Sequence, residues 1–258
     1  MNKNIIFLGV LAMVSVITSC SSEDSDVVAN SKTIKTFAET VYYNGEIDYQ
    51  NTSNFNYESG KLVSITDGSK KLEILYNGDK IIRANNYNNN NVLTGYNTLT
   101  YEGLLLKSIL NDDEDEKTEY SYLNGILSSM TNSYRNGSEW ESSRSQSYVL
   151  SNGNIQSSIT SWFGSSFKNS FEYDVKHNPM KNMNPYLKYI FQVETCDFIS
   201  SNNVLKKYYY SNMNDVTGVL SHQYIIVYDA DNYPINVKKY SINNSEQSLI
   251  SESVITYN

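Results

Sequence analysis

One short unit recurs along most of the chain and constrains its fold more than any other feature. An extended segment ends near a Tyr, a turn with Gly or Asn follows, and an aliphatic residue restarts the alternation, as in Tyr57, Gly60 and Leu62. The anchors are Tyr57, Tyr76, Tyr101, Tyr122 and Tyr148, followed by variant units at Tyr173 and Tyr228 and a final half-unit at Tyr257. The first six lie 19 to 26 residues apart, the length of two strands and two turns. Each unit is therefore interpreted as one β-hairpin.

Stacked in chain order, these hairpins predict an all-β fold, an antiparallel meander of very roughly 14 to 16 strands. The abundance of Asn, Ser and Tyr disfavours helical bundles and doubly wound α/β folds. A sheet this wide is expected to coil, split into two layers or close into a barrel, because twist accumulates and open edges attract partners. Its tyrosines are expected to pack across strands with their hydroxyls in water. The wide interval before Tyr228 is expected to hold a short helix or a capping loop at 179–191.

The N-terminus has the layout of an export signal. One Lys precedes the apolar run 5–17, which is too short to span a bilayer. The run ends in residues 17–20 (ITSC), similar to the lipobox of bacterial lipoproteins, in which Cys20 is lipidated. An ordinary signal peptide with an incidental Cys is the alternative. We expect a lipoprotein signal peptide over 1–19, lipidated Cys20 and a flexible acidic tether over 20–33, and a single all-β repeat domain over 34–258.

Acyl chains on Cys20 would make the lipid bilayer the first partner of the protein. Acidic residues within 23–26 are similar to the tag that sends some Bacteroidetes lipoproteins to the cell surface, and a solvated linker is the alternative. The expected location is the cell envelope, as an outer-membrane lipoprotein on either face. Cys196 is then the only thiol, so no intramolecular disulfide is expected, and it is interpreted as a small strand residue.

Charge and side-chain chemistry exclude several classes of function. A formal net charge of −8 argues against nucleic acid as a partner. His177 in a predicted turn and His222 in a predicted strand lack the neighbours of a zinc site. The acidic run 111–116 offers oxygens for Ca²⁺ but departs from an EF-hand loop, so it is interpreted as a solvated hairpin tip. We expect no catalytic residue, no metal and no cofactor.

Aromatic side chains are the feature with binding potential. The candidate ligand-binding residues are Trp140, Trp162, Tyr208, Tyr209 and Tyr210, whose rings offer flat faces to sugars; a purely structural role is the alternative. We expect a membrane-anchored, non-enzymatic binding module for glycan or protein. A structural or assembly protein on the periplasmic face of the outer membrane is the second interpretation, and a carbohydrate-active enzyme is the third.

The later units resemble a known family. Residues 171–174 (FEYD) with 178–179 (NP), 202–204 (NNV), and 227–229 (VYD) with Pro234 are similar to the Tyr-Asp (YD, RHS-like) repeat lipoproteins of Bacteroidetes. The resemblance covers about residues 42–258 and rests on turn and core positions rather than on a site. It implies a Tyr-rich antiparallel sheet, coiled or barrel-like, on a lipoprotein of uncharacterised function.

Overall fold

The computed structural model describes residues 32–112, 115–190, 199–244 and 246–258. Contacts group Lys32–Asn258 into one compact unit. Its strands are β1 Ile34–Tyr43, β2 Glu46–Glu58, β3 Lys61–Thr66, β4 Lys71–Asn77, β5 Lys80–Tyr87, β6 Leu93–Glu102, β7 Leu105–Asn111, β8 Glu116–Leu123, β9 Ile126–Asn136, β10 Glu139–Ser151, β11 Asn154–Trp162, β12 Ser165–Tyr173, β13 Val204–Tyr210, β14 Val219–Tyr228, β15 Pro234–Asn243 and β16 Glu246–Tyr257. One short helix, α1 Leu187–Ile190, lies among these described residues.

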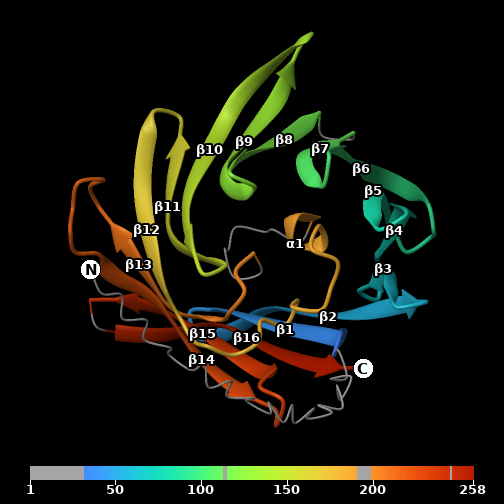
Figure 1. Cartoon of the computed structure of the whole chain (residues 1–258). Coiled ribbons are helices and arrows are strands. Elements are labelled where there is room, and N and C mark those ends of the chain that lie inside the picture. Colours follow the sequence, from blue (N-terminus) through green and yellow to red (C-terminus); the bar gives the residue numbers. More distant parts are fainter. Residues whose placement is uncertain (1–31, 113–114, 191–198, 245) are drawn as a thin grey trace, which may run out of the picture. The chain divides into compact units, whose positions relative to one another are not determined.

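The 16 strands form a single closed barrel (Figure 1). Each strand is antiparallel to its chain neighbours, and β1 pairs with β16 to close the ring. At this seam Phe37 lies opposite Ile255, and the hydroxyl oxygens of Thr36 and Thr256 are 2.6 Å apart. The predicted all-β meander is thus confirmed, and closure pairs the two edge strands of the described sheet with each other.

Six of the eight anchor tyrosines face inward at one end of their strands and share one hydrogen bond. The hydroxyl donates to a backbone carbonyl of the preceding strand, as from Tyr57 to Ile34 at 2.9 Å. The same bond, at 2.7 to 2.9 Å, joins Tyr76 to Leu62, Tyr101 to Ile81, Tyr122 to Leu106, Tyr173 to Ile155 and Tyr257 to Pro234. We call these six tyrosines the tyrosine ladder. Tyr148 and Tyr228 differ, since their hydroxyls donate to the side chains of Gln146 and Asp174. The expectation that the tyrosine hydroxyls lie in water is therefore wrong for the ladder. Each of its six hydroxyls donates a hydrogen bond to a backbone carbonyl of the barrel wall.

Tight turns and bulges follow four of the ladder positions, Tyr57, Tyr76, Tyr101 and Tyr122. Asn124 and Gly125, with φ of 52° and 77°, connect β8 to β9 in the left-handed conformation that two-residue hairpins need. Next to the turn the register shifts: Tyr122 faces Leu127, whereas Ser121 faces Ser129. The extra residue increases the local twist, which helps a wide sheet to close.

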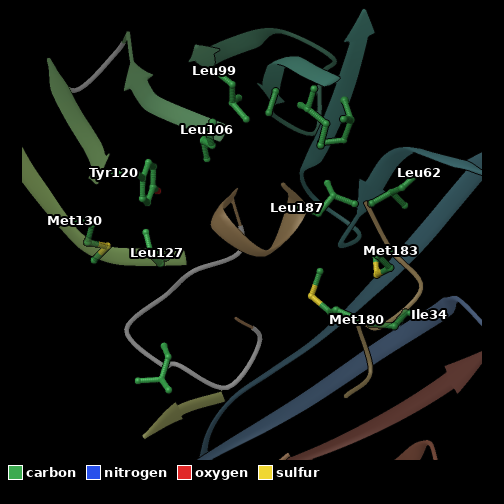
Figure 2. Close-up of a cluster of buried hydrophobic side chains, with 14 of the residues drawn as sticks. Ile34, Leu62, Leu99, Leu106, Tyr120, Leu127, Met130, Met180, Met183 and Leu187 are labelled. Atoms are coloured by element: carbon green, nitrogen blue, oxygen red, sulfur yellow. The ribbon is translucent and has the colours of Figure 1, made fainter. Parts of the chain in front are cut away.

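The connection between β12 and β13 enters the barrel. We call its described residues, 174–190 and 199–203, the plug; α1 belongs to it and lies inside the ring of strands (Figure 1). Leu187, Met180 and Met183 are buried against side chains of the barrel wall such as Ile34 and Leu62 (Figure 2). The predicted short helix or capping loop is confirmed in this interval. No helix of the described residues is long and apolar enough to cross a membrane.

Hydrogen bonds attach the plug to the turns at the end of the barrel that carries the ladder. Tyr186 Oη donates to the Leu104 carbonyl at 2.6 Å, and Asn184 Nδ2 donates to the Asp79 carbonyl at 2.8 Å. Asn182 Nδ2 reaches the Lys32 carbonyl at 2.9 Å. We call this end the closed end, and the opposite end, where β11 turns into β12, the open end.

Candidate functional site

A polar cavity of about 470 Å³ lies inside the wall formed by β8 to β14. Its volume falls in the range of small-molecule sites, about 300 to 1,000 Å³. Its lining includes the aromatic residues Trp162, Phe167, Phe171 and Tyr224, the polar residues Asn132, Gln146, Ser158, Thr160 and Asn169, and the charged residues Glu116, Arg144 and Lys207. Flat apolar rings beside amides and hydroxyls are the two kinds of group that a sugar needs, because its faces are apolar and its edges are hydroxyls.

Strand pairing positions these side chains in layers. Arg144 lies opposite Asn132 on β9 and opposite Trp162 on β11. One layer below, Gln146 pairs with Thr160, and its Nε2 donates to the Thr160 hydroxyl at 2.9 Å. Because side chains alternate between the two faces of a strand, each layer repeats after two residues. The cavity wall is therefore built by regular strands, which hold it more rigidly than loops would.

Two buried polar atoms of this wall have no hydrogen-bond partner among the described residues. They are Arg144 Nε, a donor, and Asn132 Oδ1, an acceptor, on directly opposed residues. A buried polar group without a partner costs about 1 to 3 kcal/mol. A bound molecule or water that satisfied both would remove that cost.

Cations shape the electrostatics of the lumen. His222 on β14 lies opposite Lys207, and burial lowers its pKa to about 4, with Lys239 and Lys207 adding repulsion. Its imidazole is therefore neutral near pH 7. His177 belongs to the plug instead, where its carbonyl accepts from Asn203 Nδ2 at 2.9 Å. The two histidines thus lie on different elements, and neither joins a cluster of metal ligands among the described residues.

A second, more apolar hollow of about 380 Å³ lies between the plug and strands β1, β2, β14, β15 and β16. Phe37, Phe55, Met180 and Ile226 line it, and Tyr224 borders both hollows. Burial raises the pKa of Glu39, which also borders this hollow, while Lys239 opposes that shift. This hollow has fewer polar groups than the first one, so it offers a ligand less directional recognition.

The five predicted aromatic residues do not share one face. Trp162 lines the cavity, and with 57% of its surface exposed it lies at the open end. Trp140 lies outside the barrel between Lys117 and Arg135, whose charged groups are 4.9 and 5.1 Å from its ring. Tyr209 pairs with Asn169 and points inward.

Strand alternation places Tyr208 and Tyr210 on the outer face, where the Tyr208 hydroxyl donates to Glu172 at 2.5 Å. The sequence reasoning treated 208–210 as one cluster because the residues are consecutive. In a strand, consecutive side chains point to opposite faces. This alternation predicts that Tyr209 lies on one face and that Tyr208 and Tyr210 lie on the other.

Other predicted features lie partly outside the described residues. The signal peptide, Cys20 and Cys196 fall there, as do residues 113–114 of the acidic run 111–116. In the described part of that run, Asp115 forms an ion pair with Arg135 at 3.5 Å, and Glu116 borders the cavity.

The outer face of the barrel carries polar side chains alongside exposed apolar ones such as Val149, Val227 and Val254. Hydroxyls pair across strands, as between Thr100 and Ser108 at 2.7 Å, and ion pairs join Glu172 to Lys206 at 2.9 Å. Ser157 and Ser170 likewise face each other on the outside. A barrel that crosses a bilayer needs an outward apolar band about 25 Å tall and usually has a polar interior. In the described strands the buried apolar core lies inside, and ion pairs and hydroxyl pairs lie among the apolar residues of the outer face.

The fold is shared with two solved structures. A porin-like protein from Bacteroides uniformis ATCC 8492 aligns with a TM-score of 0.54 and 10% identity, over 87% of this chain and 98% of that one. A porin-like protein from Bacteroides vulgatus ATCC 8482 aligns with a TM-score of 0.52 and 13% identity, over 88% and 99%. No family model and no curated protein matches. The fold class of the chain is therefore a closed antiparallel β-barrel, shared with these two proteins.

The predicted relationship to YD-repeat lipoproteins is wrong. The structural neighbours are porin-like barrels, and the residues that carried the resemblance belong to the closed barrel and its plug. The physical reason is that the pattern of Tyr, turn and aliphatic residue encodes the ladder, the hairpin turn and the first inward residue of the next strand.

Proposed function

We propose that the chain is a non-enzymatic binding protein of the outer membrane, held there by lipidated Cys20, and that it binds a glycan in the open end of its barrel. The observation that carries this proposal is the cavity of about 470 Å³, in which Trp162 and Phe167 lie beside Asn132, Gln146 and Asn169. Aromatic rings stack on sugar faces, and amides bond to their hydroxyls.

In this proposal the barrel lies beside the bilayer and does not form a pore through it. The ion pairs of the outer face support this arrangement, because pairs such as Lys238 with Glu252, 3.6 Å apart, would be costly in hydrocarbon. The plug supports it as well, since the fully buried Leu187 fills the lumen near the closed end. An acyl anchor on Cys20 supplies attachment without a spanning segment.

The composition of the cavity supports a binding role over a catalytic one. Glycoside hydrolysis uses two carboxyl groups about 5 to 9.5 Å apart across the scissile bond. Among the described residues that line the cavity, Glu116 supplies a carboxyl group, and the neighbouring polar groups are amides, hydroxyls and cations. This set binds and orients a saccharide but provides no acid and base pair.

The two tryptophans provide a direct test of ligand binding. The chain has 2 Trp, one in the cavity and one outside. In a Trp140→Phe variant the remaining Trp162 should change its fluorescence saturably with a defined trisaccharide, from a panel that includes α-1,4-galactotriose and α-1,4-trigalacturonate. In the matched Trp162→Phe variant the remaining Trp140 should not respond. If no saccharide of the panel changes the fluorescence of Trp162, or if the fluorescence of Trp140 changes instead, glycan binding in the cavity is contradicted.

A structural or assembly role is the second candidate, and one observation favours it. At the closed end, Leu104 and Leu123 in the hairpin tips are 79% and 69% exposed, with Ile126 exposed beside them. Exposed apolar patches mark contact surfaces for proteins or membranes. Under this role the closed end would contact envelope partners, and Trp162 would respond to none of the saccharides.

Membrane attachment is tested at the predicted lipidation site. Cys20→Ala should move the protein from the membrane fraction to the aqueous fraction almost completely, because no acyl chain would remain to enter the bilayer. The measurement is immunodetection in the two fractions after cell breakage. Cys196→Ala is the matched control and should leave the protein in the membrane fraction. Retention of the Cys20→Ala protein on membranes would overturn the proposed anchor.

A further inference from the structure

The wall of the cavity contains a donor and an acceptor that the protein leaves unsatisfied. Arg144 Nε and Asn132 Oδ1 are buried without hydrogen bonds among the described residues, and they belong to residues directly opposite each other on β10 and β9. Trp162 faces Arg144 from the other side, on β11. A cationic donor, a neutral acceptor and an exposed ring thus lie side by side in one layer.

The charges around this layer favour an anion. Arg144 and Lys207 both border the cavity, whereas Glu116 is the carboxylate among its described lining residues. None of the ion pairs formed by the described residues includes Arg144. An arginine held in a wall without a carboxylate partner is suited to binding a carboxylate from a ligand, through Nε and a terminal amino group together.

We infer that the cavity selects acidic saccharides, in which a sugar carboxylate binds Arg144 and an adjacent hydroxyl donates to Asn132 Oδ1. The inference rests on the proposed glycan-binding function and names the class of glycan. A uronic acid presents both groups, since its carboxylate accepts hydrogen bonds and its hydroxyls donate them. Trp162 would stack on a sugar face at the open end, where it remains exposed.

The outer face of the barrel supplies a matched control. Among the described residues, Arg83 Nε and Asn85 Oδ1 of β5 are likewise buried without a hydrogen-bond partner. Arg83, however, lies over the ring of Tyr96, 3.4 Å from its centre, and borders none of the hollows described above. A ligand effect at Arg144 that is absent at Arg83 therefore identifies the cavity rather than a general effect of an arginine.

The test compares two ligands of the same linkage and length, α-1,4-trigalacturonate and α-1,4-galactotriose. With Trp140→Phe as the background, the acidic ligand should bind at least tenfold more tightly at low salt. Arg144→Gln should weaken the acidic ligand about 10- to 100-fold, because charge-assisted hydrogen bonds are lost, and should change the neutral ligand less than threefold. Arg83→Gln should change neither affinity.

Far-UV circular dichroism would verify that the Arg144→Gln barrel is folded. Lys207→Gln gives a second readout, and we expect it to weaken the binding of the acidic ligand only. Equal affinity for the two ligands, or equal weakening of both by Arg144→Gln, overturns the inference and leaves glycan binding standing. If only the neutral saccharide binds tightly, the inference is likewise overturned and glycan binding still stands. If no saccharide of the panel perturbs Trp162, the inference and the proposed function both fall.

Discussion

Raising the pH above about 10 is expected to unfold the barrel in a steep, cooperative transition. Burial raises the pKa of Tyr57 and of Tyr76 to about 12. Burial also raises the pKa values of Tyr101, Tyr122 and Tyr257 in the same ladder. In the unfolded chain a tyrosine ionises near pH 10, so between about pH 10 and 12 the unfolded state loses protons that the folded state keeps.

Below about pH 10 both states are protonated and the ladder contributes its full stability; as the pH rises toward the folded pKa values, that stability is lost. Each such tyrosine steepens the loss by up to about 1.4 kcal/mol per pH unit. Ionised hydroxyls also cannot donate to the carbonyls of the neighbouring strands.

Two optical signals measure this transition together. Absorbance near 295 nm follows tyrosine ionisation, and far-UV circular dichroism follows the barrel. We expect the absorbance change of the ladder tyrosines to coincide with the loss of strand signal. Smooth ionisation of all 23 tyrosines centred near pH 10, with the barrel intact, would show that the ladder hydroxyls are accessible and would contradict their role in the wall.

The second large effect is expected from the plug. Leu187→Ala should lower the free energy of unfolding by about 2 to 5 kcal/mol, since truncating a buried Leu loses apolar contact and leaves a cavity. Leu187 is 0% exposed and belongs to the core cluster that joins the plug to the barrel wall (Figure 2). Urea denaturation, followed by circular dichroism, measures the change.

Val175→Ala is the control, because Val175 belongs to the same plug but is 93% exposed. It should change the free energy of unfolding by less than about 0.5 kcal/mol. Similar values for the two variants would mean that the plug rests loosely in the lumen and does not contribute to the core.

Much of the barrel was predictable because each hairpin is encoded by residues that are close together in the sequence. The anchors from Tyr57 to Tyr257 marked the hairpins, and the even spacing led to a strand number close to the 16 observed. Closure was one of several options, since pairing of Ile255 with Phe37 depends on contacts between the two ends of the domain. The carbonyl partners of the tyrosines were not predictable for the same reason, because register and bulges determine them.

The candidate site was less accessible to sequence reasoning. Trp162 was singled out for its flat ring, and it does line the cavity. Arg144 was missed, because a lone Arg in a Ser-rich strand carries no motif. Its position opposite Asn132 and Trp162 follows from the register of three strands, one of which has a bulge at Ser143. Once the inward positions are known, an inward charged residue is the signal that would have identified it.

The seam between β1 and β16 determines how this chain must fold. Fifteen of the sixteen strand pairings join strands that follow one another in the sequence, and the last joins residues as far apart as Thr36 and Thr256. A chain emerging from a ribosome or a secretion channel can therefore add hairpins one by one at low contact order. Until the last strand arrives, two bare edges remain open to other chains. Loss of the final 13 residues, 246–258, would make that aggregation-prone intermediate permanent.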